Sequence, residues 1–145
     1  MIAVDTNILV YAHRAESPLH AQAWDVLRQL ATGASTWLLP FHCLIEFQQI
    51  VTHPKIYRPA SSIEIALGFI DRTIASPSVV VGYDSPGTLK QFRAILADTR
   101  IVGPQVHDAR IAAVCLEHGV SELWSADRGF ERISQLNVLN PLIRP

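Results

Sequence analysis

The sequence is poor in several features that are typical of particular classes of protein. Only two cysteines occur among its 145 residues, too few for a disulfide framework or a cysteine-rich zinc finger. Charged residues make up 17% of the chain and the formal net charge is −1. The chain therefore lacks the excess positive charge typical of many nucleic-acid-binding proteins. Any contact with a nucleic acid must come from a local patch or through a bound cation.

Long apolar runs are also missing, although hydrophobic residues make up 49% of the chain. No segment is long and apolar enough to span a bilayer. The amino terminus enters a strand-like pattern at Ile2, without a basic segment, an apolar stretch and a small-residue cleavage site. We therefore expect a soluble, cytoplasmic protein that makes no membrane contact, with Cys43 and Cys115 reduced and in the core.

The chain reads as one domain over residues 1–145, because no repeat, low-complexity tract or charge block divides it. Helical patterns alternate with short aliphatic runs. This alternation predicts an α/β fold with a central parallel sheet of about five strands, flanked by helices on both faces. The predicted strands cover residues 2–4, 37–39, 79–81, 122–125 and 138–139.

Capping residues mark several predicted helices. Ser17 as N-cap, Pro18 in the first turn and Gly33 beyond the end predict the first long helix. We expect its core-facing stripe to contain Ala23, Trp24, Leu27, Leu30 and Ala31. Further helices are expected over residues 40–51, 62–75, 87–96 and 107–119.

Two aspartates directly follow predicted strands. Asp5 comes after Ile2-Ala3-Val4, and Asp127 lies just past residues 122–125. The carboxyl ends of parallel strands are where ligands bind in open α/β sheets, so both carboxylates are expected at one edge. Taken singly, Asp5 is equally well interpreted as a helix cap. Asp127 taken singly is better interpreted as an ordinary turn residue.

Glu46 lies within a predicted helix at the boundary of its apolar face. Helical spacing places it beside Cys43 and Phe47, with His42 on its polar side. An isolated charge at such a boundary is costly to bury, so the position favours a cation or a basic partner. The alternative is a surface glutamate whose carboxylate extends into solvent.

Asp108 stands at the start of the last predicted helix. An acidic residue there is ordinary, because the helix dipole favours negative charge at its amino end. Asp108 nevertheless shares a face with Ile111 and Cys115, which predicts that it points inward. Arg110 and Glu117 lie on the opposite face, and we expect them to be solvated.

The four carboxylates together predict a metal site. Asp5, Glu46, Asp108 and Asp127 supply oxygen ligands from four parts of the chain, which is the chemistry that Mg²⁺ and Mn²⁺ prefer. Without a cation, four neighbouring carboxylates would repel one another, so raised pKa values are expected in the metal-free protein. We treat all four as candidate catalytic residues and metal ligands.

Several stretches of the sequence match the motifs of one protein family. In chain order they are Ile2-Ala3-Val4-Asp5-Thr6-Asn7-Ile8-Leu9, Glu46-Phe47 with Thr52-His53-Pro54, residues 106–113, residues 123–127 and Asn140-Pro141-Leu142. In this order the chain resembles the PIN-domain nucleases, specifically the VapC-type toxins of bacterial toxin-antitoxin pairs. Each motif alone is weak, whereas their order and spacing together are specific.

This resemblance implies an endoribonuclease that depends on Mg²⁺ or Mn²⁺, is inhibited by a cognate antitoxin protein, and forms a homodimer. It places the metal site at the same four carboxylates, with Thr6 and Ser125 as secondary polar residues. Ser125 stands where family members often carry threonine, so the hydroxyl is kept. RNA is the implied substrate.

Two other functions compete with this reading. A phosphoryl-transfer domain also places an aspartate after its first parallel strand, but Asp5-Thr6-Asn7 lacks a second aspartate two residues on. A PIN-fold protein-binding module would retain the acidic residues for structure alone. RNA cleavage that depends on a metal separates the nuclease from both.

Basic residues near the motifs are candidates for RNA contact: Arg14, Lys55, Arg128 and Arg132. Each is equally consistent with an ordinary surface charge. The histidines show no paired spacing that suggests zinc, and we interpret His13, His42 and His107 as structural or rim residues.

Overall fold

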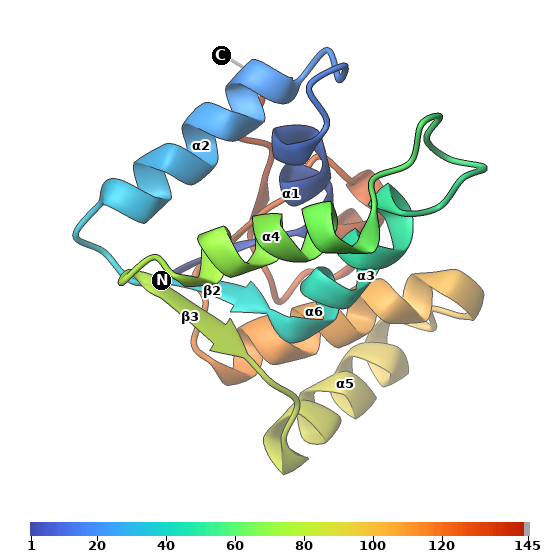
Figure 1. The fold of residues 1–145 in the computed structure, drawn as a ribbon. Coiled ribbons are helices and arrows are strands. Elements are labelled where there is room, and N and C mark those ends of the chain that lie inside the picture. The colour runs from blue at the N-terminus through green and yellow to red at the C-terminus, as the bar shows by residue number, and fades with distance from the viewer. Residues whose placement is uncertain (144–145) are drawn as a thin grey trace.

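A parallel sheet of five strands forms the centre of the computed structural model, which describes residues 1–143 (Figure 1). Its strand order is β3-β2-β1-β4-β5, and every neighbouring pair is parallel. The predicted fold class and strand positions are confirmed. The strands are β1 (Ile2–Val4), β2 (Trp37–Pro40), β3 (Val79–Gly82), β4 (Glu122–Trp124) and β5 (Val138–Leu139).

Helices connect the strands and cover the sheet, with α2 above it and α5 and α6 below it in Figure 1. Within the described residues, none of the helices is long and apolar enough to cross a membrane. The helices are α1 (Thr6–His13), α2 (His20–Thr32), α3 (Phe41–Val51), α4 (Ile63–Ile74), α5 (Pro86–Thr99) and α6 (Val106–Glu117). Two short 3-10 helices, η1 (Gly103–Gln105) and η2 (Arg128–Arg132), flank α6 and β4.

The core lies between the sheet and these helices. All four residues of β2 are buried, as are Ala3 and Val4 of β1, which is typical of parallel strands covered on both faces. Phe47 of α3 and Ile111 of α6 pack fully buried in the same core. Cys43 and Cys115 are buried and unbonded, as expected.

Helix ends largely follow the capping residues. Ser62 accepts a hydrogen bond from the Ile65 amide at the start of α4, and Gly119 adopts a left-handed conformation after α6, with φ of +67°. The helix predicted over 87–96 is longer, because Ser85 and Thr88 form a capping box that starts α5 at Pro86.

Two predictions for α2 are wrong in detail. The helix begins at His20 with Leu19 as N-cap, because Ser17 closes a preceding turn instead, where its hydroxyl accepts from the Leu19 amide. Trp24 is 50% exposed, whereas the predicted stripe placed it in the core. The stripe is narrower and centres on Ala23, Val26 and Leu27.

The strand order places a switch point at the centre of the sheet. From β1 the chain moves to β2 and β3 on one side, and it returns to β4 and β5 on the other. Adjacent strands whose connections leave in opposite directions open a crevice at their carboxyl ends. Asp5 follows β1 and Ser125 follows β4, so both stand at this crevice.

Candidate metal centre

One cleft of about 470 Å³ gathers all four acidic residues singled out in the sequence. It opens at the switch point between β1 and β4, with α1, α3 and α6 contributing its walls. Its lining residues are Asp5, Thr6, Asn7, Val10, Tyr11, Glu46, Gln49, Ile50, Tyr57, Asp108 and Asp127.

Asp5 lies at the bottom of the cleft, with only 4% of its surface exposed. It is the N-cap of α1, and its Oδ1 accepts from the Thr6 amide at 2.7 Å. Its Oδ2 accepts from Asn7 Nδ2 at 2.7 Å and from Ser125 Oγ at 2.6 Å. The cap reading and the cleft reading of Asp5 are therefore both correct, and the carboxylate is fixed in one orientation.

Ser125 and Asn7 tie the ends of β1 and β4 together. The Ser125 hydroxyl donates to Asp5 and accepts from Asn7 Nδ2 and from the Asp127 amide, each at 3.0 Å. A hydroxyl has one donor and two acceptor positions, so this group is fully used. Asn7 Oδ1 in turn accepts from the Ala126 amide. Sequence reasoning quoted Asn7 only as part of a motif and missed this contact.

Glu46 reaches the cleft from α3, and two neighbours hold its carboxylate. Oε2 accepts from Thr6 Oγ1 at 2.6 Å. Oε1 lies 3.3 Å from Nε2 of His42, one helical turn earlier. Thr6 therefore contacts two of the four acidic residues, through its amide and through its hydroxyl.

Asp108 differs from these two carboxylates, because no donor in residues 1–143 hydrogen-bonds to it. It lies in the first turn of α6 and points into the cleft, as its helical face predicted. Gly129 passes so close that a Cβ there would lie 2.8 Å from Asp108 Oδ2. A side chain at Gly129 would push this carboxylate out of place.

Asp127 caps the short helix η2 and is exposed at the rim of the cleft. Its Oδ1 accepts from the Gly129 amide at 2.7 Å, so the turn role considered from sequence is present as well. Its charge acts on Asp108, whose pKa it raises.

Burial and mutual repulsion shift the acidity of the cluster. Burial first, and then the charges of Glu46 and Asp108, raise the pKa of Asp5 to about 6 despite its hydrogen bonds. Burial and the charges of Asp127 and Glu46 also raise the pKa of Asp108 to about 6. Burial opposes ionisation of Glu46 too, but hydrogen bonds from His42 and Thr6 outweigh it and lower its pKa.

The donor set fits a hard divalent cation. Four carboxylates face one cleft, and the pKa values of Asp5 and Asp108 show that their charges are poorly compensated by the protein. Oxygen ligands and uncompensated negative charge are what Mg²⁺ and Mn²⁺ require. The residues are therefore suited to bind such a cation.

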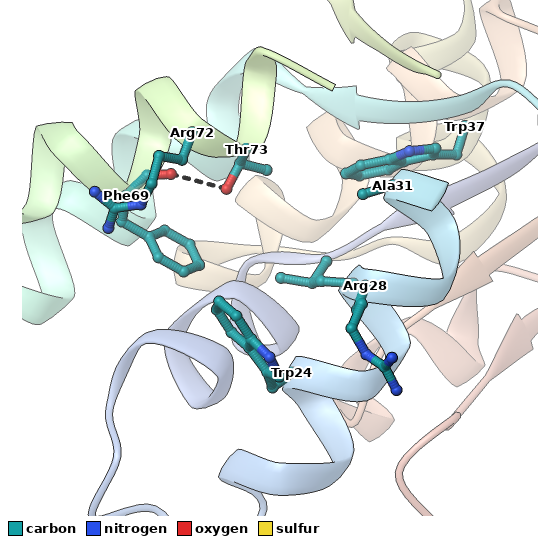
Figure 2. A pocket seen from close by; sticks show the side chains of 8 residues that line it. Trp24, Arg28, Ala31, Trp37, Phe69, Arg72 and Thr73 are labelled. Atoms are coloured by element: carbon teal, nitrogen blue, oxygen red, sulfur yellow. Dashed lines mark hydrogen bonds between the residues drawn. The ribbon is translucent and has the colours of Figure 1, made fainter. Parts of the chain in front are cut away.

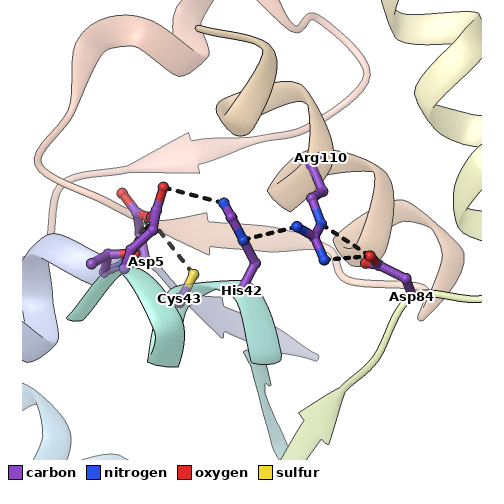
Figure 3. Close-up of polar contacts among 7 residues, drawn as sticks. Asp5, His42, Cys43, Asp84 and Arg110 are labelled. Carbon is purple, nitrogen blue, oxygen red and sulfur yellow. Dashed lines mark hydrogen bonds and ion pairs between the residues drawn. The ribbon is translucent and has the colours of Figure 1, made fainter. Parts of the chain in front are cut away.

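Behind Glu46, His42 and Arg110 form a chain of contacts that sequence reasoning did not foresee (Figure 3). Arg110 was expected to be solvated, but its guanidinium contacts His42 Nδ1 at 3.1 Å and Asp84 Oδ2 at 2.5 Å. Glu117 is likewise engaged, since it accepts from the hydroxyls of Ser85 and Thr88. His42 and Glu46 are four residues apart on one helix face, and this spacing was the sequence signal from which their contact could have been predicted.

Two of the four basic residues nominated for RNA contact are engaged in contacts within the protein. Arg14 pairs with Glu16, donates to Ser61 Oγ and to the Pro59 carbonyl, and lies over the Tyr57 ring. Arg132 donates to Gln105 and to the Thr99 carbonyl. Lys55 and Arg128 are exposed, and their contact with RNA stays a prediction.

Comparison with known proteins agrees with this architecture, because the PIN domain family matches residues 2–136 of this chain. The chain belongs to the PIN domain family. Ribonuclease VapC43 of Mycobacterium tuberculosis is 34% identical over 142 residues, which cover 98% of this chain and 96% of that protein. Ribonuclease VapC48 of the same organism is 25% identical over 137 residues, 94% of each chain.

Solved structures share the PIN fold. VapBC2 from Rickettsia felis, bound to a DNA fragment from its promoter, has a TM-score of 0.70 at 21% identity. The match covers 97% of this chain and 98% of the Rickettsia felis chain. Mycobacterium tuberculosis VapC20, a sarcin-ricin loop cleaving toxin, has a TM-score of 0.65 at 21% identity and covers 90% and 93% of the two chains.

The raised pKa of Asp5 predicts how stability depends on pH when no cation is bound. With a native pKa of about 6 against an ordinary value of 3.8, the native state binds more protons than the unfolded state between these values. The free energy of unfolding therefore falls as pH rises through this window, by up to about 3 kcal/mol from this residue. In Asp5→Asn this contribution disappears.

Denaturant unfolding in the presence of a chelator, repeated across this pH window, measures the effect. Asp71→Asn, an exposed aspartate of α4, makes the same chemical change and should follow the wild type. Equal pH slopes for the wild type and Asp5→Asn would contradict the assignment.

Proposed function

We propose that this PIN domain is the toxin of a toxin-antitoxin pair, an endoribonuclease that uses Mg²⁺ or Mn²⁺ to cut RNA phosphodiester bonds. One observation carries the proposal: Asp5, Glu46, Asp108 and Asp127 line a single cleft at the switch point of the sheet. The relatives named VapC ribonucleases support the same activity. We also propose that residues 1–145 form one domain and that the protein works in the cytoplasm.

In this proposal the two most constrained aspartates have different tasks. Asp5 is held rigidly by Thr6, Asn7 and Ser125, so it fixes where the cation binds. Asp108 offers both oxygens, because no donor in residues 1–143 occupies them. A bound cation would lower the pKa of a water to make a nucleophile and neutralise charge on the phosphate. Glu46 and Asp127 complete the site, and either is placed to accept the proton from that water.

A phosphoryl-transfer function that uses Asp5 as the nucleophile is disfavoured by the same geometry. Asp5 is almost fully buried, and both of its oxygens already accept hydrogen bonds. A carboxylate held by four donors, the fourth being the Cys43 thiol, is a poor nucleophile and has no free approach for a phosphoryl group. The protein-binding alternative predicts instead that the cleft is inert when Mn²⁺ is supplied.

We propose that the antitoxin covers an apolar groove between α2 and α4 (Figure 2). In Figure 2, Trp24 of α2 and Phe69 of α4 face each other across it. Arg28 and Arg72 flank the groove, so it suits a segment that combines apolar and acidic residues. The solved VapBC structures from Rickettsia felis and Salmonella typhimurium support a protein partner of this kind.

We propose that a second copy of the chain covers a different surface, between α3 and α4. It is lined by Phe41, Ile45 and Leu67, which are exposed, and by uncharged polar residues such as Gln48. A twofold interface pairs the same patch of both copies and brings residues near the axis beside their own copies, so an uncharged apolar surface avoids repulsion between like charges. This distinguishes it from the groove that Arg28 and Arg72 flank.

Replacement of Asp108 tests the nuclease. Asp108→Asn keeps the shape but removes one ligand charge, worth several kcal/mol, so cleavage of total RNA with Mn²⁺ should fall at least about 100-fold. Gel analysis of RNA with and without a chelator measures it, and Asp71→Asn is the matched control. Cleavage that survives the chelator, or that is unchanged in Asp108→Asn, would refute the metal-dependent mechanism.

Truncation of Trp24 tests the antitoxin groove. Trp24→Ala should weaken binding of the cognate antitoxin at least about tenfold, because a large aromatic anchor is lost, while RNA cleavage stays unchanged. Leu89→Ala provides the control, since Leu89 is 51% exposed and Trp24 is 50% exposed. Calorimetric titration measures both, and equal affinities would place the antitoxin elsewhere.

A charge in the α3–α4 surface tests the homodimer. Ile45→Glu should convert a dimer into a monomer in light scattering, because an unpaired carboxylate would be buried in the interface. Val102→Glu places the same charge at a residue that is 78% exposed outside this surface. The prediction fails if Ile45→Glu remains a dimer or if the wild type is a monomer.

A further inference from the structure

His42 links the acidic cleft to an ion pair on the outer side of α6. Its ring is 8% exposed and lies between Glu46 and Arg110, while the exposed His107 ring stacks on it at 5.1 Å. On its far side, Arg110 is anchored by Asp84, which receives hydrogen bonds from both Nε and Nη2. Figure 3 shows this chain running from Asp84 through Arg110 to His42.

The chemistry of Arg110 decides which nitrogen of His42 carries hydrogen. A guanidinium has donors and no acceptor. Nη1 of Arg110 lies 3.1 Å from His42 Nδ1, so Nδ1 must act as the acceptor and carry no hydrogen. The ring hydrogen is therefore on Nε2, the nitrogen that faces Glu46.

Nε2 has one available acceptor. Glu46 Oε1 lies 3.3 Å away as an ion-pair contact, and this buried nitrogen makes no well-aligned hydrogen bond within residues 1–143. The second oxygen of Glu46 accepts from Thr6 Oγ1. The Thr6 hydroxyl holds one oxygen and the His42 ring lies against the other, so the direction in which Glu46 faces the cleft depends on His42.

The same groups resemble a cation site, since ligand atoms of His42, Glu46 and His107 lie within 4.8 Å of one another. The contact between Arg110 and His42 Nδ1 is inconsistent with a cation at this position. A cation at Nε2 would displace the ring hydrogen while Nδ1 still accepts from Arg110, which would require an imidazolate ring. Loss of the Arg110 contact would have to come first.

We propose that Asp84, Arg110 and His42 form a positioning relay, in which Arg110 fixes the tautomer of His42 and His42 orients Glu46 for the cation. The effect of this relay on cation binding rests on the proposed function, because it assumes that Glu46 is oriented toward a metal cleft. Its structural part, the tautomer and its cause, stands independently of any nuclease activity.

Nitrogen NMR of protein with labelled histidine tests the structural part in the absence of metal. The neutral His42 ring should carry its hydrogen on Nε2 alone, and Arg110→Met should produce a mixture of tautomers. Asp84→Asn, on the exposed side, should act in the same direction without disturbing the core. Arg93→Met, an exposed arginine of α5, should change nothing. A His42 ring that carries hydrogen on Nδ1 in the wild type would overturn the relay.

Binding of Mn²⁺ tests the consequence. His42→Leu should weaken Mn²⁺ binding about 10- to 100-fold, the range typical of residues that orient a metal ligand. His42→Gln should retain most of the affinity, because its amide can accept from Arg110 and donate to Glu46. Calorimetry measures binding, and thermal unfolding confirms that both variants fold.

The outcomes separate the two proposals. Equal losses in His42→Gln and His42→Leu, or loss of the Nε2 hydrogen signal when diamagnetic Zn²⁺ is added, would overturn the relay and favour His42 as a ligand. If the wild type binds no Mn²⁺ while the tautomer responds to Arg110→Met, the proposed function fails and the relay remains.

Discussion

Repulsion among carboxylates confined to one crevice is the constraint on which the rest of this site depends. Asp5 is nearly inaccessible, yet its four hydrogen bonds do not compensate its burial and its charged neighbours. The protein therefore tolerates the cluster only through partial protonation or through an added positive charge. Residues of the neighbouring elements hold the carboxylate oxygens in fixed orientations, but they do not neutralise the charge of these carboxylates.

Much of the fold and of the clustering follows from patterns that are local in sequence. Strand positions were predictable because buried parallel strands are short aliphatic runs, and Asp5 and Asp127 directly follow two of them. Once the sheet is parallel, strand ends meet at one edge whatever the loops do. Glu46 and Asp108 were placed by helical periodicity, which fixes a face relative to the buried residues of the same helix.

The features that could not be predicted from the sequence depend on contacts between elements that are distant in the chain. Periodicity put Arg110 on the outer face of α6 correctly, but a long side chain from that face reaches Asp84 and His42 on other segments. Trp24 was placed in the core by the helical spacing of the apolar residues in α2, whereas it is 50% exposed and lines the groove between α2 and α4. The direction of the His42 hydrogen depends wholly on Arg110, 68 residues away.

The positions of the basic groups bear on the order of events in the proposed reaction. Within the described chain, none of the residues lining the cleft is lysine or arginine. Arg14 is held against Tyr57 and the Pro59 carbonyl, and Arg110 is held by Asp84 behind His42. Within the cleft itself, an RNA phosphate would meet carboxylates and no lysine or arginine of the lining until a cation is bound. In the proposed reaction, a cation held by Asp5, Glu46, Asp108 and Asp127 before or together with the phosphate would relieve this repulsion, and His42 would serve that step by orienting Glu46.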